Sequence, residues 1–184
     1  MRYVASLMAG LALFGCATGG SPPAPASGTT TTSIMGARGG LMDIEMTTDA
    51  GGTVFSVDAP VDRVWTALTT AYNTLDIPVS VSDARARSMG NTSLSISRSF
   101  AGEPMANLLS CGVMGGVAAN NYRIQMSLLT NLTAAPGGGT RVRTIVSATG
   151  RDPFAANPPV QCASTFNLER KIAILLNQQL QPAS

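Results

Sequence analysis

The residues that could perform acid–base, nucleophilic or metal chemistry are few and scattered along the chain. There is no histidine and only one lysine, Lys171, which follows Arg170 in a segment that predicts a helix. The ten carboxylates include one close pair, Asp43 and Glu45, on the expected exposed face of a strand. The absence of histidine excludes Ser-His-Asp and Cys-His catalysis and imidazole metal sites. The sequence therefore predicts a non-catalytic protein without a metal or other cofactor, and a hydrolase with an unfamiliar site is the weaker alternative.

The amino-acid composition indicates which classes of partner the protein is expected to bind. Of 184 residues, 12% are charged, and the formal net charge is +2. A nucleic-acid-binding domain usually carries a strongly basic face, so we expect no nucleic-acid partner. The length fits a single globular domain.

The first 15 residues have the pattern of a secretory signal. Arg2 precedes an apolar run at residues 3–14, and small Gly15 follows it. The run is shorter than the ~20 residues that a membrane-spanning helix needs. Residues 13–16, LFGC, resemble the lipobox of bacterial lipoproteins, which implies cleavage before Cys16 and attachment of acyl chains such as palmitate. The alternative is an ordinary signal peptide in which Cys16 is incidental.

Residues 16–40 predict a lipidated cysteine followed by a flexible tether, with one domain at residues 41–184. The tether is rich in Gly, Pro, Ser and Thr and contains a single charge, Arg38, so it cannot bury enough apolar surface to fold. In Gram-negative lipoproteins an aspartate directly after the cysteine tends to retain the protein at the inner membrane. Ala17 occupies that position here. The resemblance therefore implies an anchor in the outer membrane, with the domain facing the periplasm.

Hydrophobic periodicity predicts the elements of the domain. A strand pair covers residues 41–57 and a helix covers residues 60–75. Strands follow at residues 77–82, 93–100, 122–132 and 140–148, with turns at residues 90–91 and 136–139, and a helix closes the chain at about residues 165–179. The order β-β-α-β-β-β-β-α predicts an α+β domain, in which an antiparallel sheet of about five to six strands packs with two helices.

Four side chains of this domain are candidates for contact with a ligand or partner. Trp65 lies within the apolar stripe of the first helix, where a core position is favoured over ligand stacking. Arg141 and Arg143 alternate with apolar residues on one strand, and Arg123 is expected beside them on the paired strand. An anionic partner could bind this arginine group, although a solvated face is the favoured interpretation.

Cys111 and Cys162 are the two cysteines that remain after Cys16. In an oxidising compartment they are expected to form a disulfide that ties the glycine-rich segment 101–121 to the base of the last helix. Two separate buried thiols, or a reactive Cys111, are the alternatives. Residues 101–121 are predicted to form a short helix or strand packed on the sheet, with a mobile flap over a pocket, or a partner-docking loop, as the alternative.

Two family resemblances bear on function. The run VDAPVDRVWTAL at residues 57–68 resembles the opening of helix-grip domains. Together with residues 75–79, Asp83 and Gly90 it is similar to the BamC family of outer-membrane assembly lipoproteins, over roughly residues 53–100. This implies a membrane-anchored binding or assembly module with an envelope protein partner. The same run resembles START-like proteins, which implies instead a carrier of a small hydrophobic ligand in a cavity under the last helix.

Overall fold

The computed structural model describes residues 28–35, 41–49, 51–112, 118–154 and 156–181. Within these residues the chain forms strands, three α-helices and one 3₁₀ helix, η1 (Ala119–Asn121). The α-helices are α1 (Val61–Thr74), α2 (Met105–Leu108) and α3 (Asn167–Leu180). The strands are β1 (Gly28–Met35), β2 (Leu41–Asp49), β3 (Gly52–Val57), β4 (Val81–Asp83), β5 (Ser88–Ser97), β6 (Ser99–Phe100), β7 (Glu103–Pro104), β8 (Leu109–Ser110), β9 (Arg123–Ala134), β10 (Thr140–Arg151) and β11 (Val160–Ser164).

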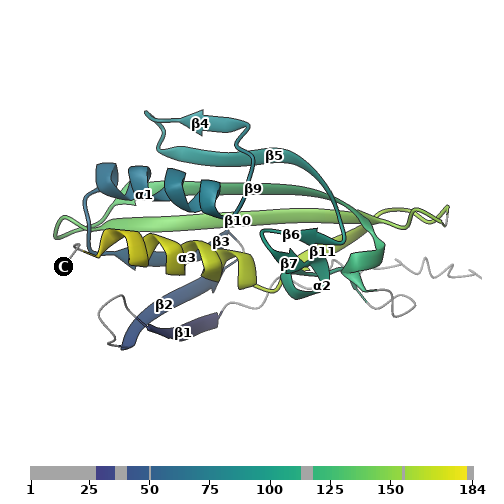
Figure 1. Cartoon of the computed structure of the whole chain (residues 1–184), viewed down its shortest axis with the longest axis horizontal. Helices are drawn as coiled ribbons and strands as arrows, with labels where there is room; N and C mark the ends of the chain where they lie inside the picture. The colour runs from purple at the N-terminus through teal and green to yellow at the C-terminus, as the bar shows by residue number, and fades with distance from the viewer. Residues whose placement is uncertain (1–27, 36–40, 50, 113–117, 155, 182–184) are drawn as a thin grey trace, which may run out of the picture.

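Nine of these strands form one antiparallel sheet. Its main order is β1-β2-β3-β10-β9-β5-β4, while β11 pairs with the end of β10 and β8 pairs with β11. The strands β6 and β7 form a separate two-stranded ribbon. Figure 1 shows β9 and β10 running along the length of the molecule, with α1 and α3 on the same side of the sheet.

The predicted fold class, an α+β domain with five to six strands and two helices, is wrong. The described chain is β-rich, with a nine-stranded sheet, an additional ribbon and three α-helices. Short elements account for much of the difference, because β6, β7 and β8 have only two residues each and α2 has four, too few to show a hydrophobic period.

The tether prediction for residues 16–40 is wrong over Gly28–Met35, which form β1. This strand pairs with β2 along its whole length, from Gly28 opposite Thr48 to Met35 opposite Leu41. Four consecutive threonines at residues 29–32 explain the difference, because β-branched residues favour strands and here a partner strand is available. The predicted signal peptide, Cys16 and the rest of the tether lie outside the described residues.

The hairpins were predicted more accurately than the turn at residues 90–91. The pairing of β2 with β3 confirms the hairpin over residues 41–57, and β9 and β10 meet at the predicted tip, where Gly137 and Gly138 have positive φ. Gly90, however, lies inside β5, opposite Leu129. A Cβ atom at Gly90 would lie 2.0 Å from the backbone oxygen of Leu128, so glycine serves close approach of the strands rather than a turn.

The hydrophobic core lies between one face of the sheet and the two long helices. The helix α1 begins directly after Pro60, whose carbonyl oxygen accepts a hydrogen bond from the Val64 N–H, and it buries its apolar stripe on the sheet. The helices α1 and α3 also pack against each other. The largest fully buried side chains between the layers are Val64, Leu68, Tyr72, Leu128, Leu168, Ile172 and Leu176.

A row of buried threonines crosses this face of the sheet. Thr48, Thr53, Thr144 and Thr130 lie opposite one another on β2, β3, β10 and β9. The hydroxyls of Thr130 and Thr144 are hydrogen-bonded at 3.1 Å, and the Tyr72 hydroxyl lies 3.0 Å from that of Thr130. Burial raises the pKa of Tyr72 to about 12, against the smaller opposing effect of this hydrogen bond. The row therefore joins α1 to the middle of the sheet.

Candidate binding surfaces

The disulfide predicted between Cys111 and Cys162 is present. The two Sγ atoms are 2.12 Å apart, and the Cα atoms are 3.9 Å apart. Cys111 directly follows β8, and Cys162 lies in β11, the strand with which β8 pairs. The bridge therefore reinforces an existing strand pair.

The described parts of the segment 101–121 pack onto the domain, as predicted. Met105, Leu108 and Leu109 are fully buried. Lys171 of α3 forms a 2.7 Å ion pair with Glu103 and donates a hydrogen bond to the carbonyl oxygen of Ala101. This ion pair lowers the pKa of Glu103. Lys171 thus links the β6–β7 ribbon to α3.

Glu169 is a buried carboxyl that sequence reasoning missed. Its side chain is 2% exposed, and it accepts a 2.9 Å hydrogen bond from the hydroxyl of Ser164. Burial raises its pKa, and the hydrogen bond from Ser164 only partly opposes that effect. A helical wheel could have indicated it, because Glu169 lies four residues before Ala173 on the buried stripe of α3.

Trp65 is partly buried and packs against the hydrophobic core, which agrees with the core position that its place in the apolar stripe favours. The guanidinium of Arg87 lies 6.0 Å from the centre of its ring and also forms an ion pair with Asp62. The turn between β4 and β5 brings Arg87 to this place. Val64, Leu68 and Tyr72 are the large α1 side chains that are fully buried.

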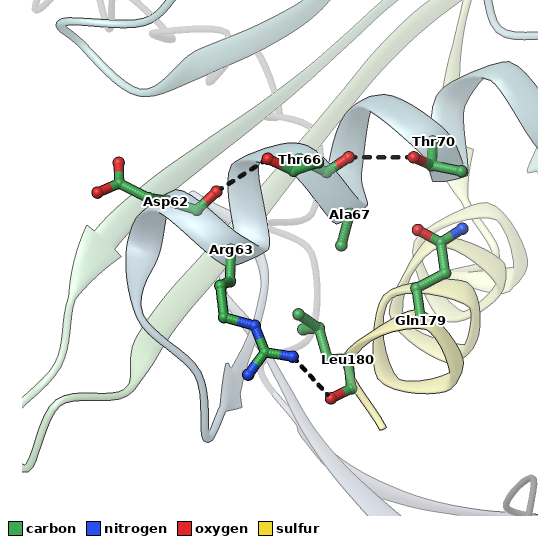
Figure 2. Close-up of a pocket in the computed structure, with 7 residues that line it drawn as sticks. All are labelled: Asp62, Arg63, Thr66, Ala67, Thr70, Gln179 and Leu180. Carbon is green, nitrogen blue, oxygen red and sulfur yellow. Dashed lines mark hydrogen bonds between the residues drawn. The ribbon is translucent and has the colours of Figure 1, made fainter. Parts of the chain in front are cut away.

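A groove of about 530 Å³ lies between the start of α1 and the end of α3, as Figure 2 shows. The Arg63 guanidinium reaches across it to the carbonyl oxygen of Leu180, at 3.5 Å. The hydroxyls of Thr66 and Thr70 donate to carbonyl oxygens of their own helix. Few polar groups are thus left to recognise a ligand in this groove.

The predicted grouping of Arg123 with Arg141 and Arg143 is wrong. Although all three lie on the open face of the sheet, Arg141 pairs with Thr133, whereas Arg123 pairs with Arg151 at the other end of β10. Arg123 and Thr133 are ten residues apart on β9, or about 34 Å along the strand.

Arg143 and Arg141 have different surroundings. Arg143 donates two hydrogen bonds of 3.2 Å to Asp49, whose pKa is lowered first by the Gly51 N–H and then by this arginine. Arg141 is exposed and lines two neighbouring depressions of about 720 and 390 Å³, both shared with Ser56. Arg143 is therefore part of a structural ion pair, and Arg141 remains available to a partner.

A second group of arginines lies at the opposite end of the open face. Arg98, Arg123 and Arg151 are all exposed there, and Arg98 and Arg123 line a depression of about 510 Å³ together with Phe154. Sequence reasoning missed Arg98, Arg151 and Phe154. Extending the β9–β10 hairpin from its tip would have placed residue 151 opposite residue 123, because the register stays constant along both strands.

The described residues contain neither a metal-ligand cluster nor a membrane-spanning helix. No group of three or more His, Cys, Asp or Glu residues among them could hold a metal ion. In the same part of the chain, no helix has the length and apolar character needed to cross a membrane.

Searches of protein-family models and of curated proteins find no match to this chain.

Proposed function

We propose that this chain is an exported, lipid-anchored protein whose domain acts as a non-catalytic binding or assembly module in the cell envelope. The signal pattern and the lipobox-like residues 13–16 support export and acylation at Cys16. The Cys111–Cys162 disulfide also supports export, because such bonds persist mainly in oxidising compartments. Ala17 directly after the cysteine favours the outer membrane, with the domain facing the periplasm.

A surface-binding module is favoured over a ligand carrier because side chains fill the space between the sheet and its helices. A carrier of a small hydrophobic ligand needs a cavity of a few hundred Å³ at this place. Leu68 and Tyr72 of α1, Leu128 of β9 and Ile172 of α3 instead occupy it as fully buried side chains. The opposite face of the sheet carries exposed polar residues along β9 and β10, including Arg141. Recognition through that open face fits this arrangement better than enclosure of a ligand.

Fractionation of cells that express Cys16→Ser tests the anchor. We expect the variant to leave the membrane fraction, since acyl chains on Cys16 would be its firm attachment. The neighbouring change Thr18→Ser keeps the thiol and should leave the protein in the membrane fraction. Equal membrane retention of Cys16→Ser and the unmodified chain would contradict the proposal.

Native mass spectrometry of the detergent-free Cys16→Ser protein distinguishes a surface-binding module from a carrier of a hydrophobic ligand. A carrier would retain a hydrophobic molecule at one copy per chain. We expect the mass of the protein alone, because its core is filled. A stoichiometric apolar ligand would contradict the assignment as a surface-binding module.

A further inference from the structure

One end of the sheet concentrates positive charge without acidic partners. Arg123 of β9 lies directly opposite Arg151 of β10, and on its other side it pairs with Ser97, the residue before Arg98. All three arginines are exposed. None of them forms an ion pair with an acidic residue within the described chain.

This arrangement does not serve the stability of the sheet. Like charges directly opposite each other on neighbouring strands destabilise an antiparallel pair. Further along the same face, Arg143 is matched by Asp49 on β2. The pair Arg123–Arg151 lacks such a match, which is the arrangement expected where an external anion supplies the negative charge.

Phe154 extends this basic end into solvent. It is 96% exposed, the highest value among the large hydrophobic side chains of the described residues. Its backbone N–H donates a 2.8 Å hydrogen bond to Asp152, so the turn after β10 holds the phenyl ring outward. Asp152 is the one acid among the residues lining the 510 Å³ depression, and its Oδ1 is engaged in that turn.

The described chain begins toward the same end of the molecule. Gly28 is opposite Thr48, which lies in one row with Thr53 and Thr144 of β10. From Thr144, β10 runs seven residues further to Arg151, or about 24 Å. In Figure 1 the loop after β10 lies at one end of the long axis, and α3 finishes toward the other end.

The chain before Gly28 is long enough to bring this end to a membrane. Gly28 lies twelve residues after Cys16, and this distance along a fully extended chain is about 40 Å. A cysteine held in a bilayer therefore permits contact between the Arg123–Arg151 end and the surface of that bilayer. An anionic surface attracts arginines, and a phenyl ring can insert at the boundary between headgroups and acyl chains.

We propose that the basic tip, formed by Arg98, Arg123, Arg151 and Phe154, rests on anionic lipid headgroups of the membrane that holds Cys16. This inference relies on the proposed lipid anchor for its orientation. The arginines would pair with lipid phosphates, and Phe154 would insert between the headgroups. The contact would hold the domain against the membrane by its tip and leave the groove between α1 and α3 facing away.

Vesicle co-sedimentation of unacylated protein tests the basic tip. The protein is the chain from residue 16 with Cys16→Ser, which retains every described residue. The vesicles contain phosphatidylcholine alone or phosphatidylcholine with an equal part of phosphatidylglycerol. We expect binding to the anionic vesicles only. Each arginine near an anionic surface contributes about a fivefold factor in affinity, so Arg123→Gln with Arg151→Gln should weaken binding about 25-fold.

The matched control is Arg141→Gln with Arg85→Gln, which removes the same charge from exposed positions elsewhere. It should weaken binding much less than the tip variant, and Phe154→Ser should weaken binding without any change in charge. Equal losses in the two double variants, or equal binding to neutral vesicles, would overturn the proposal. Displacement by inorganic phosphate beyond that by sodium chloride at equal ionic strength would also overturn it, in favour of a free anion. Because the protein is unacylated, failure here is independent of the result for Cys16 in cells.

Discussion

Glu169 combines an ionisable group with nearly complete burial, at the N-terminal turn of α3. An acidic residue is favourable there when exposed, because it interacts with the positive end of the helix. Here the side chain points into the core and is hydrogen-bonded to Ser164. Its ionisation therefore costs folding free energy, since the charged form is poorly solvated in the folded state.

The raised pKa of Glu169 predicts a pH dependence with a definite sign. Below the ordinary glutamate pKa the side chain is neutral in both states and carries no penalty. As pH rises through the higher folded-state value, its contribution to the free energy of unfolding is lost. Glu169→Gln should therefore gain stability relative to the unmodified protein as pH rises above the ordinary glutamate range, measured by urea unfolding at pH values from about 5 to about 8.

The exposed Glu45 supplies the control for this measurement. Glu45→Gln should show a stability difference from the unmodified protein that stays nearly constant over the same pH range. A constant difference for Glu169→Gln as well would show that Glu169 is not held in a buried, poorly solvated state. Asp49, Asp83 and Glu103 have lowered pKa values and act in the opposite direction, since their contribution is lost as pH falls.

At the residue scale, the number and type of residues predicted the covalent partners, whereas the surroundings of single side chains depended on distant segments. Cys111 and Cys162 were paired by the small number of cysteines and the expected compartment, and that pairing is present. The apolar stripe of α1 correctly indicated that Trp65 packs against the core, but it did not predict the Arg87 guanidinium over its ring, which comes from a distant turn. The pairing of Arg123 with Arg151 needed the strand register as well as the strand pattern.

At the scale of elements, α1 is attached to the sheet by polar as well as apolar contacts. The Tyr72 hydroxyl reaches Thr130 and the carbonyl oxygen of Met89, which belong to the adjacent strands β9 and β5. Loss of the hydroxyl in Tyr72→Phe removes these bonds from a fully buried site. We predict a loss of about 1 kcal/mol in the free energy of unfolding, measured by urea denaturation.

Tyr122→Phe is the matched control for this prediction. Tyr122 is also buried, but its hydroxyl takes part in no hydrogen bond within the described residues. Its replacement should change stability by much less than that of Tyr72. If both variants lost the same amount, the link between α1 and the threonine row would contribute nothing specific to stability.

The disulfide joins the residue after β8 to β11, and the loop that it closes contains β9 and β10. It closes a loop of 51 residues, for which the chain-entropy estimate is about 4 kcal/mol, an upper value. We predict that the double variant Cys111→Ser with Cys162→Ser unfolds at clearly lower urea concentration but keeps the β8–β11 pair.

Thiol labelling of the denatured, unreduced protein checks this bridge directly. The Cys16→Ser chain should contain no free thiol, and the further double variant should not differ from it in labelling. Two reactive thiols per chain in the Cys16→Ser protein would show that the bridge does not form. In that case the packing of β8 on β11 would depend on strand pairing and apolar contacts alone.

Local patterns predicted the longer elements and failed for those that depend on distant partners. The helices α1 and α3 and the hairpins β2–β3 and β9–β10 follow from period and turn residues within one segment. β1 was read as tether because its composition resembles a linker, and its strand exists through pairing with β2. Gly90 was predicted to lie in a turn, but it lies in β5. Glycine is required there because the backbone of β9 approaches closely.

At the scale of the whole molecule, the sheet has two faces with different uses. Helices α1 and α3 cover one face, and fully buried side chains fill the space between the layers. The other face is open and carries arginines at its two ends, of which Arg143 is neutralised by Asp49. A molecule of this form is suited to contact through its surface, and the open face and the basic tip are where we expect partners to bind.

The measurement that tests the central claim most directly is the mass of the N-terminal peptide of protein extracted from membranes with detergent. The account of an acylated envelope module predicts a mature chain that begins at Cys16 and carries acyl chains on that cysteine. Such a peptide would be lost from Cys16→Ser. A chain that begins elsewhere, with an unmodified Cys16 or without it, would contradict the lipid anchor and the membrane orientation derived from it.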